Sequence, residues 1–177
     1  MKRLFPLFLD IDGRPCLVVG AGAVALRKIA ALEECGARVT VVSPETAGRG
    51  FAESDVDGMA LVVAATDDRA VNAKVSAACR QRGIPVNVVD DPELCTFQFP
   101  AVFRKGGIAA AVSSGGGCPV AAQMVRDAVS RVVTDGFASA ARDLSARRGE
   151  LKREFPDAKE RKAYCERILS KWIDRGD

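Results

Sequence analysis

The chain has 177 residues, 48% hydrophobic and 28% charged, enough to bury the core of one domain with a smaller appendage. A net charge of only +3 and a low aromatic content argue against a dedicated nucleic-acid binder. The absence of histidine excludes histidine zinc sites, Ser-His-Asp triads and histidine acid–base chemistry. Any proton transfer must therefore use another side chain or water.

The cysteines and the N-terminus indicate the compartment. Six cysteines are scattered along the chain without C-x-x-C spacing, which is typical of reduced thiols in a cytoplasm. The N-terminal apolar run is interrupted by Pro6 and stopped by Asp10, so it is too short for a signal peptide. No stretch approaches the about 20 apolar residues of a membrane span. We expect a soluble, cytoplasmic protein that binds neither membrane nor nucleic acid.

The first half of the chain alternates short apolar runs with helical patterns. The apolar runs predict strands at residues 15–19, 38–42, 61–65 and 86–89. The first helix is expected over 23–35, and a second one is expected to start with Thr66 or Asp67 as its cap and to close at Gly83. Continuous β-branched strands that alternate with helices indicate a parallel sheet covered on both faces.

The pattern changes after Asp90-Asp91-Pro92. Residues 97–103 and 108–112, around Gly106-Gly107, predict an antiparallel hairpin, and the chain is then expected to be helical from Pro119 onward, with a break near 155–157. We therefore predict an α/β protein with a Rossmann dinucleotide-binding domain (1–96), a hairpin region (97–117) and a helical C-terminal domain (118–177).

A glycine motif, Gly20-x-Gly22-x-x-Ala25, follows the first strand and opens the first helix. The first glycine permits the tight turn, the second lets the backbone approach a pyrophosphate, and the small alanine allows close helix–strand packing. The alternative is a glycine-rich turn that binds no ligand. The candidate cofactor residues are Gly20, Gly22, Ala23, Val24, Ala25, Ser43, Pro44, Glu45 and Thr66.

The residues near the adenosine ribose should decide between NAD and NADP. An acidic partner is expected about 20 residues after the motif, where this chain has Ser43-Pro44 and then Glu45. No arginine occupies that place, because Arg49 lies several residues later. We therefore predict NAD as the cofactor.

Two further segments carry candidate chemistry. Asp90 stands just past the carboxyl end of a predicted parallel strand, the edge where ligands bind in open α/β sheets, and is the leading candidate for a general base. It is alternatively a turn residue before Pro92. The run Ser113, Ser114, Gly115 and Gly116 precedes a helix and can offer backbone N–H groups to an anion, or serve as a hinge.

With these residues assembled, the sequence resembles the precorrin-2 dehydrogenase family of siroheme synthesis over nearly its whole length. The resemblance rests on separate blocks in a fixed order: Pro6-Leu7-Phe8-Leu9, Val18 to Ala25 with Arg27-Lys28, Ala64 to Asp68 with Asn72, Asn87 to Asp90, Phe97-x-Phe99-Pro100-Ala101, and Val112 to Gly116 with Pro119.

This resemblance implies an NAD-binding Rossmann domain, a small dimerisation region, a helical C-terminal domain and a homodimer. It implies the NAD-dependent oxidation of precorrin-2 to sirohydrochlorin. Asp90 matches the residue most closely tied to activity, and Ser114 matches an active-site serine that is phosphorylated in some members. Because precorrin-2 is a polycarboxylate, Arg104, Lys105 and Arg126 are candidate substrate contacts. No resident metal is predicted.

Two departures from the family pattern and several alternatives remain. Cys118 replaces the usual serine of the glycine loop. The stretch from Glu45 to Phe51 is shorter than in the family, which usually has a helix and a third strand there. Either that strand is absent, which opens the sheet edge near the adenosine, or a segment is omitted from the sequence. We favour the omission.

Three alternatives to a dehydrogenase with this activity alone are open. They are a bifunctional dehydrogenase that also inserts ferrous iron, a Rossmann-type sensor without chemistry, and a structural dimer module.

Overall fold

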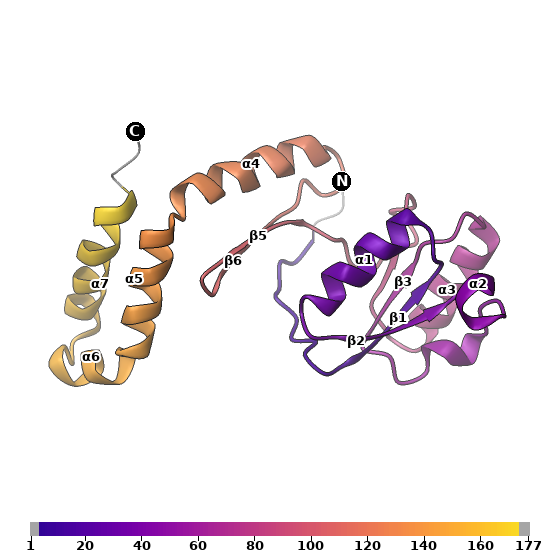
Figure 1. Ribbon diagram of the computed structural model, residues 1–177, viewed down its shortest axis with the longest axis horizontal. Helices are drawn as coiled ribbons and strands as arrows, with labels where there is room; N and C mark the ends of the chain where they lie inside the picture. The colour runs from indigo at the N-terminus through magenta and orange to yellow at the C-terminus, as the bar shows by residue number, and fades with distance from the viewer. Residues whose placement is uncertain (1–3, 174–177) are drawn as a thin grey trace. The chain divides into compact units, whose positions relative to one another are not determined.

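The computed structural model describes residues 4–173, which form two compact units; the first ends at Phe99 and the second begins at Pro100 (Figure 1). The first unit contains β1 (Pro15–Val19), α1 (Ala23–Glu33), β2 (Arg38–Val42), α2 (Pro44–Ala47), the 3₁₀ helix η1 (Glu53–Val56), β3 (Leu61–Ala64), α3 (Arg69–Gln81) and β4 (Val86–Val88). The second contains β5 (Ala101–Lys105), β6 (Ile108–Val112), α4 (Pro119–Val132), α5 (Asp135–Ala146), α6 (Arg148–Glu154) and α7 (Ala158–Ile173).

The first unit is built on a four-stranded parallel sheet with the order β2-β1-β3-β4. Leu17 of β1 pairs with Thr40 of β2 on one side and with Val62 of β3 on the other. β2 therefore lies on one side of β1 and β3 lies on the other, so the order in which the strands follow one another across the sheet reverses at β1. Such a reversal places the ligand crevice of an α/β sheet at the carboxyl ends of these strands. The predicted Rossmann-like parallel sheet is confirmed.

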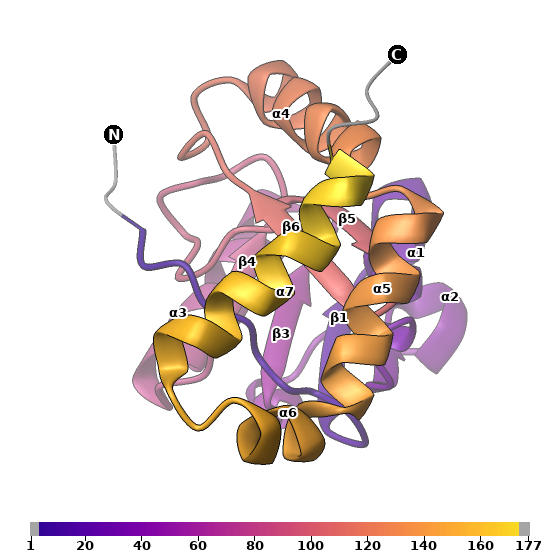
Figure 2. The same ribbon diagram turned by 90° about the vertical axis from the view of Figure 1, so that its left-hand side faces the viewer.

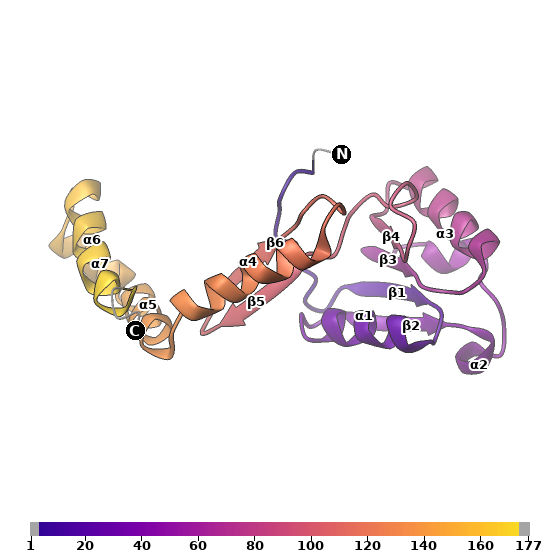
Figure 3. The same ribbon diagram turned by 90° about the horizontal axis from the view of Figure 1, so that it is seen from above.

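Alternating residues of each strand pack on opposite faces of this sheet, which explains why the strands read as continuous apolar runs. Leu17 and Val62 pack on the face that holds Val75 of α3, whereas Val18 packs on the face that holds Leu32 of α1. Figure 3 shows α1 and α3 on these opposite faces. Each fully buried leucine or valine side chain stabilises the fold by about 1.5–3 kcal/mol, so the two clusters account for much of the unit's stability.

Helix α3 begins at a different residue from the one predicted. The prediction that Thr66 or Asp67 caps it is wrong, because the Asp68 carboxylate accepts the N–H groups of Ala70 at 2.8 Å and Val71 at 3.2 Å. A short aspartate side chain at this position satisfies N–H groups that have no partner in the first helical turn. Thr66 is thereby left for a different contact, described below.

The link between β2 and β3 contains no further strand, whereas the resemblance implies a helix and a strand there. It consists of α2 and η1, and the Val56 side chain of η1 is fully buried in the sheet core. β2 is therefore the edge strand of the described sheet. The residues of the given sequence form a packed connection between β2 and β3.

The second unit combines a hairpin with four helices. β5 and β6 pair antiparallel as predicted, with Phe103 opposite Ala110, but β5 begins at Ala101 rather than at Phe97. The reason is that Phe97 packs against the core of the first unit. Helix α4 packs on the hairpin and has Pro119 at its start, as predicted, whereas α5 and α7 lie side by side (Figure 2).

The predicted break at 155–157 is present between α6 and α7. The carboxylate of Asp157 accepts the N–H groups of Lys159 at 2.8 Å and Glu160 at 3.0 Å, which starts the new helix after Pro156. The helical region also breaks before α5, where the Thr134 hydroxyl accepts the N–H of Phe137 at 3.2 Å. Both breaks follow the usual preference for side-chain oxygens at helix starts.

All six cysteines are free thiols. Cys16 and Cys79 are fully buried, and burial raises the pKa of both thiols, that of Cys79 to about 11. Cys35 packs beside the same core as Cys16. Of the helices between Leu4 and Ile173, none combines the length and the apolar character that a bilayer crossing requires. Residues 1–3, which precede the N-terminal apolar run, lie outside the described residues, and the apolar side chains of the run itself (Leu4, Phe5 and Leu7 to Leu9) are exposed.

Candidate dinucleotide and catalytic site

The carboxyl ends of the four parallel strands bring most of the predicted cofactor residues to one edge of the sheet. Hydrogen bonds link the segments that leave these strands: the Gly20 N–H donates to Val42 O at 2.9 Å, and the Ala65 N–H donates to Val19 O at 2.8 Å. The Val89 N–H donates to Ala64 O at 2.9 Å. These bonds place four predicted site residues at one edge of the sheet, because each of them lies within two residues of a bonded group: Gly20, Ser43, Thr66 and Asp90.

The turn between β1 and α1 has the shape that a pyrophosphate requires. Gly20 has a φ of +118°, and a Cβ there would clash with the Ala65 carbonyl oxygen. A Cβ on Gly22 would meet nothing within 4 Å, so the space over the start of α1 is open. Gly22 gives α1 no side-chain cap, and no acidic residue lies in the first turn. The N-terminal partial charge of α1 is thus available to an anion, and these residues fit a dinucleotide.

The remaining residues of this turn have two kinds of role. Ala25 is fully buried in the same cluster as Val18, so a small residue permits the close approach of α1 to β1. Ala23 is exposed and Val24 is half-buried, and both belong to the first turn of α1. At this position the backbone N–H groups of the two residues, rather than their side chains, are the groups that a phosphate could contact.

The end of β2 offers few polar groups for a ribose. Ser43 is buried, and its hydroxyl accepts the Thr46 N–H at 3.1 Å, so this side chain is used as the cap of α2. Pro44 is the first residue of that helix. Glu45 is exposed, and hydrogen bonds from its own backbone N–H and from the Ser43 hydroxyl lower the pKa of its carboxyl. Glu45 is thus the ionised carboxylate nearest in sequence to the end of β2.

Thr66 is held by a residue that sequence reasoning did not include in the site. Asn72 of α3 is buried; its carbonyl oxygen accepts the Thr66 hydroxyl at 2.8 Å, and its amide donates to Thr66 O at 2.9 Å. This reciprocal pair fixes the chain where it leaves β3. Asn72 belongs to one of the sequence blocks that carry the family resemblance, Ala64 to Asp68 with Asn72. Nothing in that block, however, indicated a contact between Asn72 and Thr66.

Asp90 has an unusual backbone conformation. Its φ is +59°, and it is the one non-glycine among residues 4–173 with a positive φ. Aspartate tolerates this left-handed region better than most residues, but the conformation persists only where the surroundings fix it. The carboxylate is exposed at the end of β4, where a ligand bound at this edge of the sheet would reach it.

The segment after Asp90 is anchored from α3. Ser76 is 1% exposed; its hydroxyl donates to Leu94 O at 2.7 Å and accepts from Arg80 Nε at 3.3 Å. Arg80 Nη2 donates to Glu93 O at 2.8 Å. Two carbonyl groups of this loop are therefore fixed by adjacent turns of one helix.

The same segment is also anchored to the sheet and to α1. Cys95 Sγ accepts the Val88 N–H at 3.1 Å, and the Thr96 hydroxyl accepts the Val86 N–H at 2.8 Å. Further on, Lys28 Nζ of α1 lies 3.8 Å from the ring centroid of Phe99, and burial lowers the pKa of this lysine. These anchors hold the loop 90–99 in one position, and with it the backbone of Asp90.

Ser76→Ala tests this anchoring. Because the half-buried Leu94 carbonyl would lose its partner, we expect the free energy of unfolding to fall by about 1–2 kcal/mol. With a looser loop, kcat for the reaction proposed below should fall about fivefold, since small misplacements of a catalytic group are costly, while the Kd for NADH stays unchanged. Ser130→Ala is the matched control, because the Ser130 hydroxyl bonds only to its own helix, at Asp127 O. A Ser76→Ala enzyme with normal kcat would contradict the anchoring role.

The candidate substrate residues lie in the second unit. In the loop between β6 and α4, Ser113 Oγ accepts the Gly115 N–H at 3.1 Å and Ser114 Oγ accepts the Cys118 N–H at 3.0 Å. The Gly117 N–H donates to Ser114 O at 3.2 Å. The Gly115 N–H, one of the groups expected to face an anion, is therefore bonded inside the loop, as are the N–H groups of Gly117 and Cys118 that follow it. Gly115 and Gly116 both have positive φ, which allows the tight turn.

The basic candidates of the second unit are partly engaged in ion pairs. Arg126 pairs with Asp127 at 2.6 Å, and Lys105 pairs with Asp135 at 3.0 Å. Arg104 is exposed on β5. Such surface pairs contribute little to stability and exchange readily, so a polycarboxylate can compete for these cations.

Comparison with known proteins identifies the family. A family profile described as "Putative NAD(P)-binding" matches residues 7–101, which include the whole sheet and every predicted cofactor residue. The chain belongs to this NAD(P)-binding family. Its relatives include the siroheme synthases of Ectopseudomonas mendocina (42% identical over 180 residues) and Thioalkalivibrio sulfidiphilus (42% over 180 residues). The alignments cover 94% and 93% of this chain but only 39% and 37% of those proteins.

A solved structure matches this NAD(P)-binding protein along its full length. It is described as "SirC, precorrin-2 dehydrogenase"; the match has a TM-score of 0.64 and 25% sequence identity, and it covers 98% of this chain and 100% of that one. The chain thus spans about two fifths of the curated siroheme synthases and the whole of SirC. The family is the N-terminal domain family of the siroheme synthases, as the sequence blocks had predicted.

Proposed function

We propose that this chain is an NAD-dependent dehydrogenase that oxidises precorrin-2 to sirohydrochlorin. The observation that carries the proposal is the end-to-end match to SirC, a protein described as a precorrin-2 dehydrogenase. The open turn at Gly22 and the carboxylate of Asp90, at one edge of a parallel sheet, supply the two parts that a dehydrogenase of this kind needs. The free cysteines fit a reducing cytoplasm.

The reaction removes a hydride and a proton from the macrocycle. Bound NAD supplies the hydride acceptor. Gly22 and the first turn of α1 would hold the pyrophosphate through backbone N–H groups and the helix dipole, while Gly20 permits the tight turn that leads to them. The Asp90 carboxylate takes the proton as the neighbouring C–H bond breaks, and passes it to water when the product leaves. The balance is precorrin-2 and NAD⁺ to sirohydrochlorin, NADH and one proton.

The test is an anaerobic incubation of the purified protein with precorrin-2 and NAD, in parallel with NADP, followed by the visible spectrum. Sirohydrochlorin that forms only with dinucleotide supports the proposal. A well-folded protein that binds NADH but leaves precorrin-2 unchanged would instead favour a dinucleotide sensor. Ferrous iron added afterwards reports any chelatase activity separately.

We also propose that the chain acts as a homodimer through the second unit. Val120, Met124 and Val125 of α4 are 63%, 68% and 51% exposed, respectively. β5 and β6 form a two-stranded sheet that is only marginally stable by itself. A second copy would cover these apolar side chains and the strand edges.

Met124→Asp tests this assembly. A charge in the centre of the apolar surface of α4 should convert a dimer to a monomer, as measured by light scattering after size-exclusion chromatography. Lys152→Asp on α6, an exposed charge reversal away from α4, is the control and should stay dimeric. A wild-type protein that is monomeric at high concentration would reject the proposal.

A further inference from the structure

The link between β2 and β3 contains one basic residue, and its position bears on the choice of cofactor. NADP differs from NAD by a phosphate on the adenosine ribose, which is usually recognised by an arginine near the end of the second strand. Between Ser43 and Asp68 the sequence contains a single lysine or arginine, Arg49. Arg49 is therefore the one cation that this link can offer to a 2′-phosphate.

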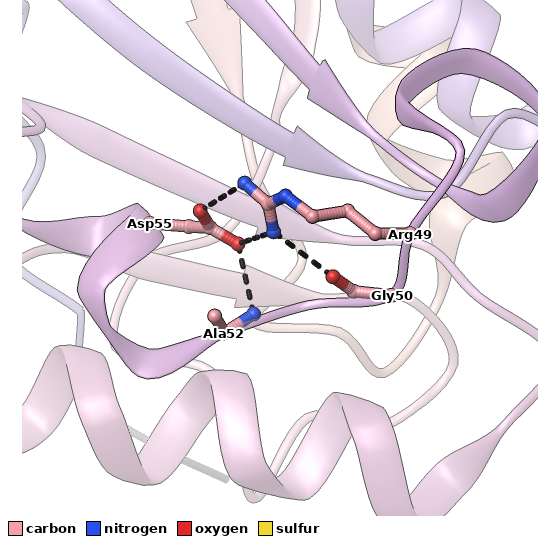
Figure 4. Close-up of polar contacts among 4 residues, drawn as sticks. All are labelled: Arg49, Gly50, Ala52 and Asp55. Carbon is pink, nitrogen blue, oxygen red and sulfur yellow. Dashed lines mark hydrogen bonds and ion pairs between the residues drawn. The ribbon is translucent and has the colours of Figure 1, made fainter.

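In the structure, the Arg49 guanidinium is already bound to another side chain, the Asp55 carboxylate. Arg49 Nη2 donates to Asp55 Oδ1 at 2.6 Å, and Nη1 donates to Asp55 Oδ2 at 2.8 Å and to Gly50 O at 3.0 Å (Figure 4). Parallel bonds between a guanidinium and a carboxylate form the most directional ion pair available to arginine. The pair spans the link from the second residue after α2 to the 3₁₀ helix η1.

Asp55 cannot readily move away with its partner. Its side chain is only 10% exposed, and Oδ2 also accepts the Ala52 N–H at 2.8 Å. The next residue, Val56, is fully buried in the sheet core and holds η1 in place. Moving Arg49 toward a phosphate would therefore leave a largely covered carboxylate without its counter-charge, which is costly.

We infer that Asp55 is a specificity-determining residue that makes the chain select NAD over NADP by withholding Arg49 from the 2′-phosphate. This inference rests on the proposed dinucleotide site but not on the identity of the substrate. Glu45, an ionised carboxylate just beyond β2, acts in the same direction because it repels a second negative group.

The experiment measures direct binding of NADH and NADPH to the full-length protein, without precorrin-2. The wild type should prefer NADH. In Asp55→Asn the amide oxygen can still accept the Ala52 N–H, but the counter-charge is lost, so the Kd for NADPH should fall about tenfold while that for NADH changes less than about twofold. Circular dichroism and thermal unfolding of each variant establish that it is folded.

Two further variants make the result specific to Arg49. In Arg49→Gln/Asp55→Asn the gain in NADPH affinity should disappear, and in Arg49→Gln alone NADPH affinity should equal that of the wild type. The inference is overturned if folded Asp55→Asn does not bind NADPH more tightly, if the gain survives in the double variant, or if Arg49→Gln alone weakens NADPH binding. None of these outcomes depends on whether precorrin-2 is the substrate, so the inference and the proposed reaction can fail separately.

Discussion

Asp90→Asn is expected to lower kcat with precorrin-2 and NAD by about 10²-fold or more, the usual contribution of a positioned general base. Asparagine is the informative replacement because it also tolerates the left-handed backbone that Asp90 adopts, with φ at +59°. Alanine would add backbone strain to the loss of the carboxylate and so confuse the two effects. The Kd for NADH should stay within about twofold of the wild type, because the proposed cofactor contacts lie at the other strand ends.

Asp91→Asn is the matched control for this prediction. It removes the same charge one residue away, and asparagine can still accept the Leu94 N–H that the Asp91 carboxylate accepts at 3.4 Å. We expect near-normal kcat for this variant. An Asp90→Asn enzyme as active as Asp91→Asn would remove Asp90 from the chemistry. A rise in KM at constant kcat would assign Asp90 to binding the macrocycle rather than to proton transfer.

The second large effect is expected at the glycine turn, where two alanine substitutions should separate stability from binding. Gly20→Ala places a Cβ against the Ala65 carbonyl oxygen, and its φ of +118° is unfavourable for alanine. We expect the free energy of unfolding to fall by about 2 kcal/mol or more, since backbone strain and overpacking each cost about 1–3 kcal/mol. Urea unfolding followed by circular dichroism measures this loss.

Gly22→Ala is the counterpart, because its Cβ would enter open space. As the cap of α1 it should cost less than about 1 kcal/mol of stability. The same methyl group occupies the space that we assign to the pyrophosphate, so the Kd for NADH should rise about tenfold or more. Fluorescence titration with NADH tests this value. Unchanged NADH binding in Gly22→Ala would place the dinucleotide elsewhere.

The comparison of Gly20 with Gly22 also shows why a motif alone says little about roles. Both glycines belong to the same fingerprint, and both were predicted to permit cofactor binding. The structure separates them, since a Cβ at the first would clash with the chain beyond β3, whereas a Cβ at the second would meet only open space. The neighbour of Gly20, Ala65, lies far along the chain, and no local pattern predicts that contact.

Local sequence determined the elements and predicted the edge at which the candidate site lies. The β-branched runs, the glycine turn and Pro119 each report on the conformation of the residues around them, because backbone preferences and hydrophobic periodicity act over a few residues. Asp90 was found in the same way, as a carboxylate directly after a buried strand. The predicted strand over Arg38–Val42 and the parallel sheet agree with the structure for this reason.

Only the tertiary structure decided which side chains are already engaged. Ser43 and Thr66 were predicted as cofactor contacts, yet Ser43 caps α2 and Thr66 bonds to Asn72. Likewise, Arg49 was set aside by its distance from Ser43 in sequence, and the structure adds that Asp55 holds its guanidinium. A polar side chain satisfies its hydrogen bonds with whatever group folding brings near. Sequence therefore determined the elements and indicated where the candidate site lies, and tertiary packing decided which of its polar groups already have hydrogen-bond partners.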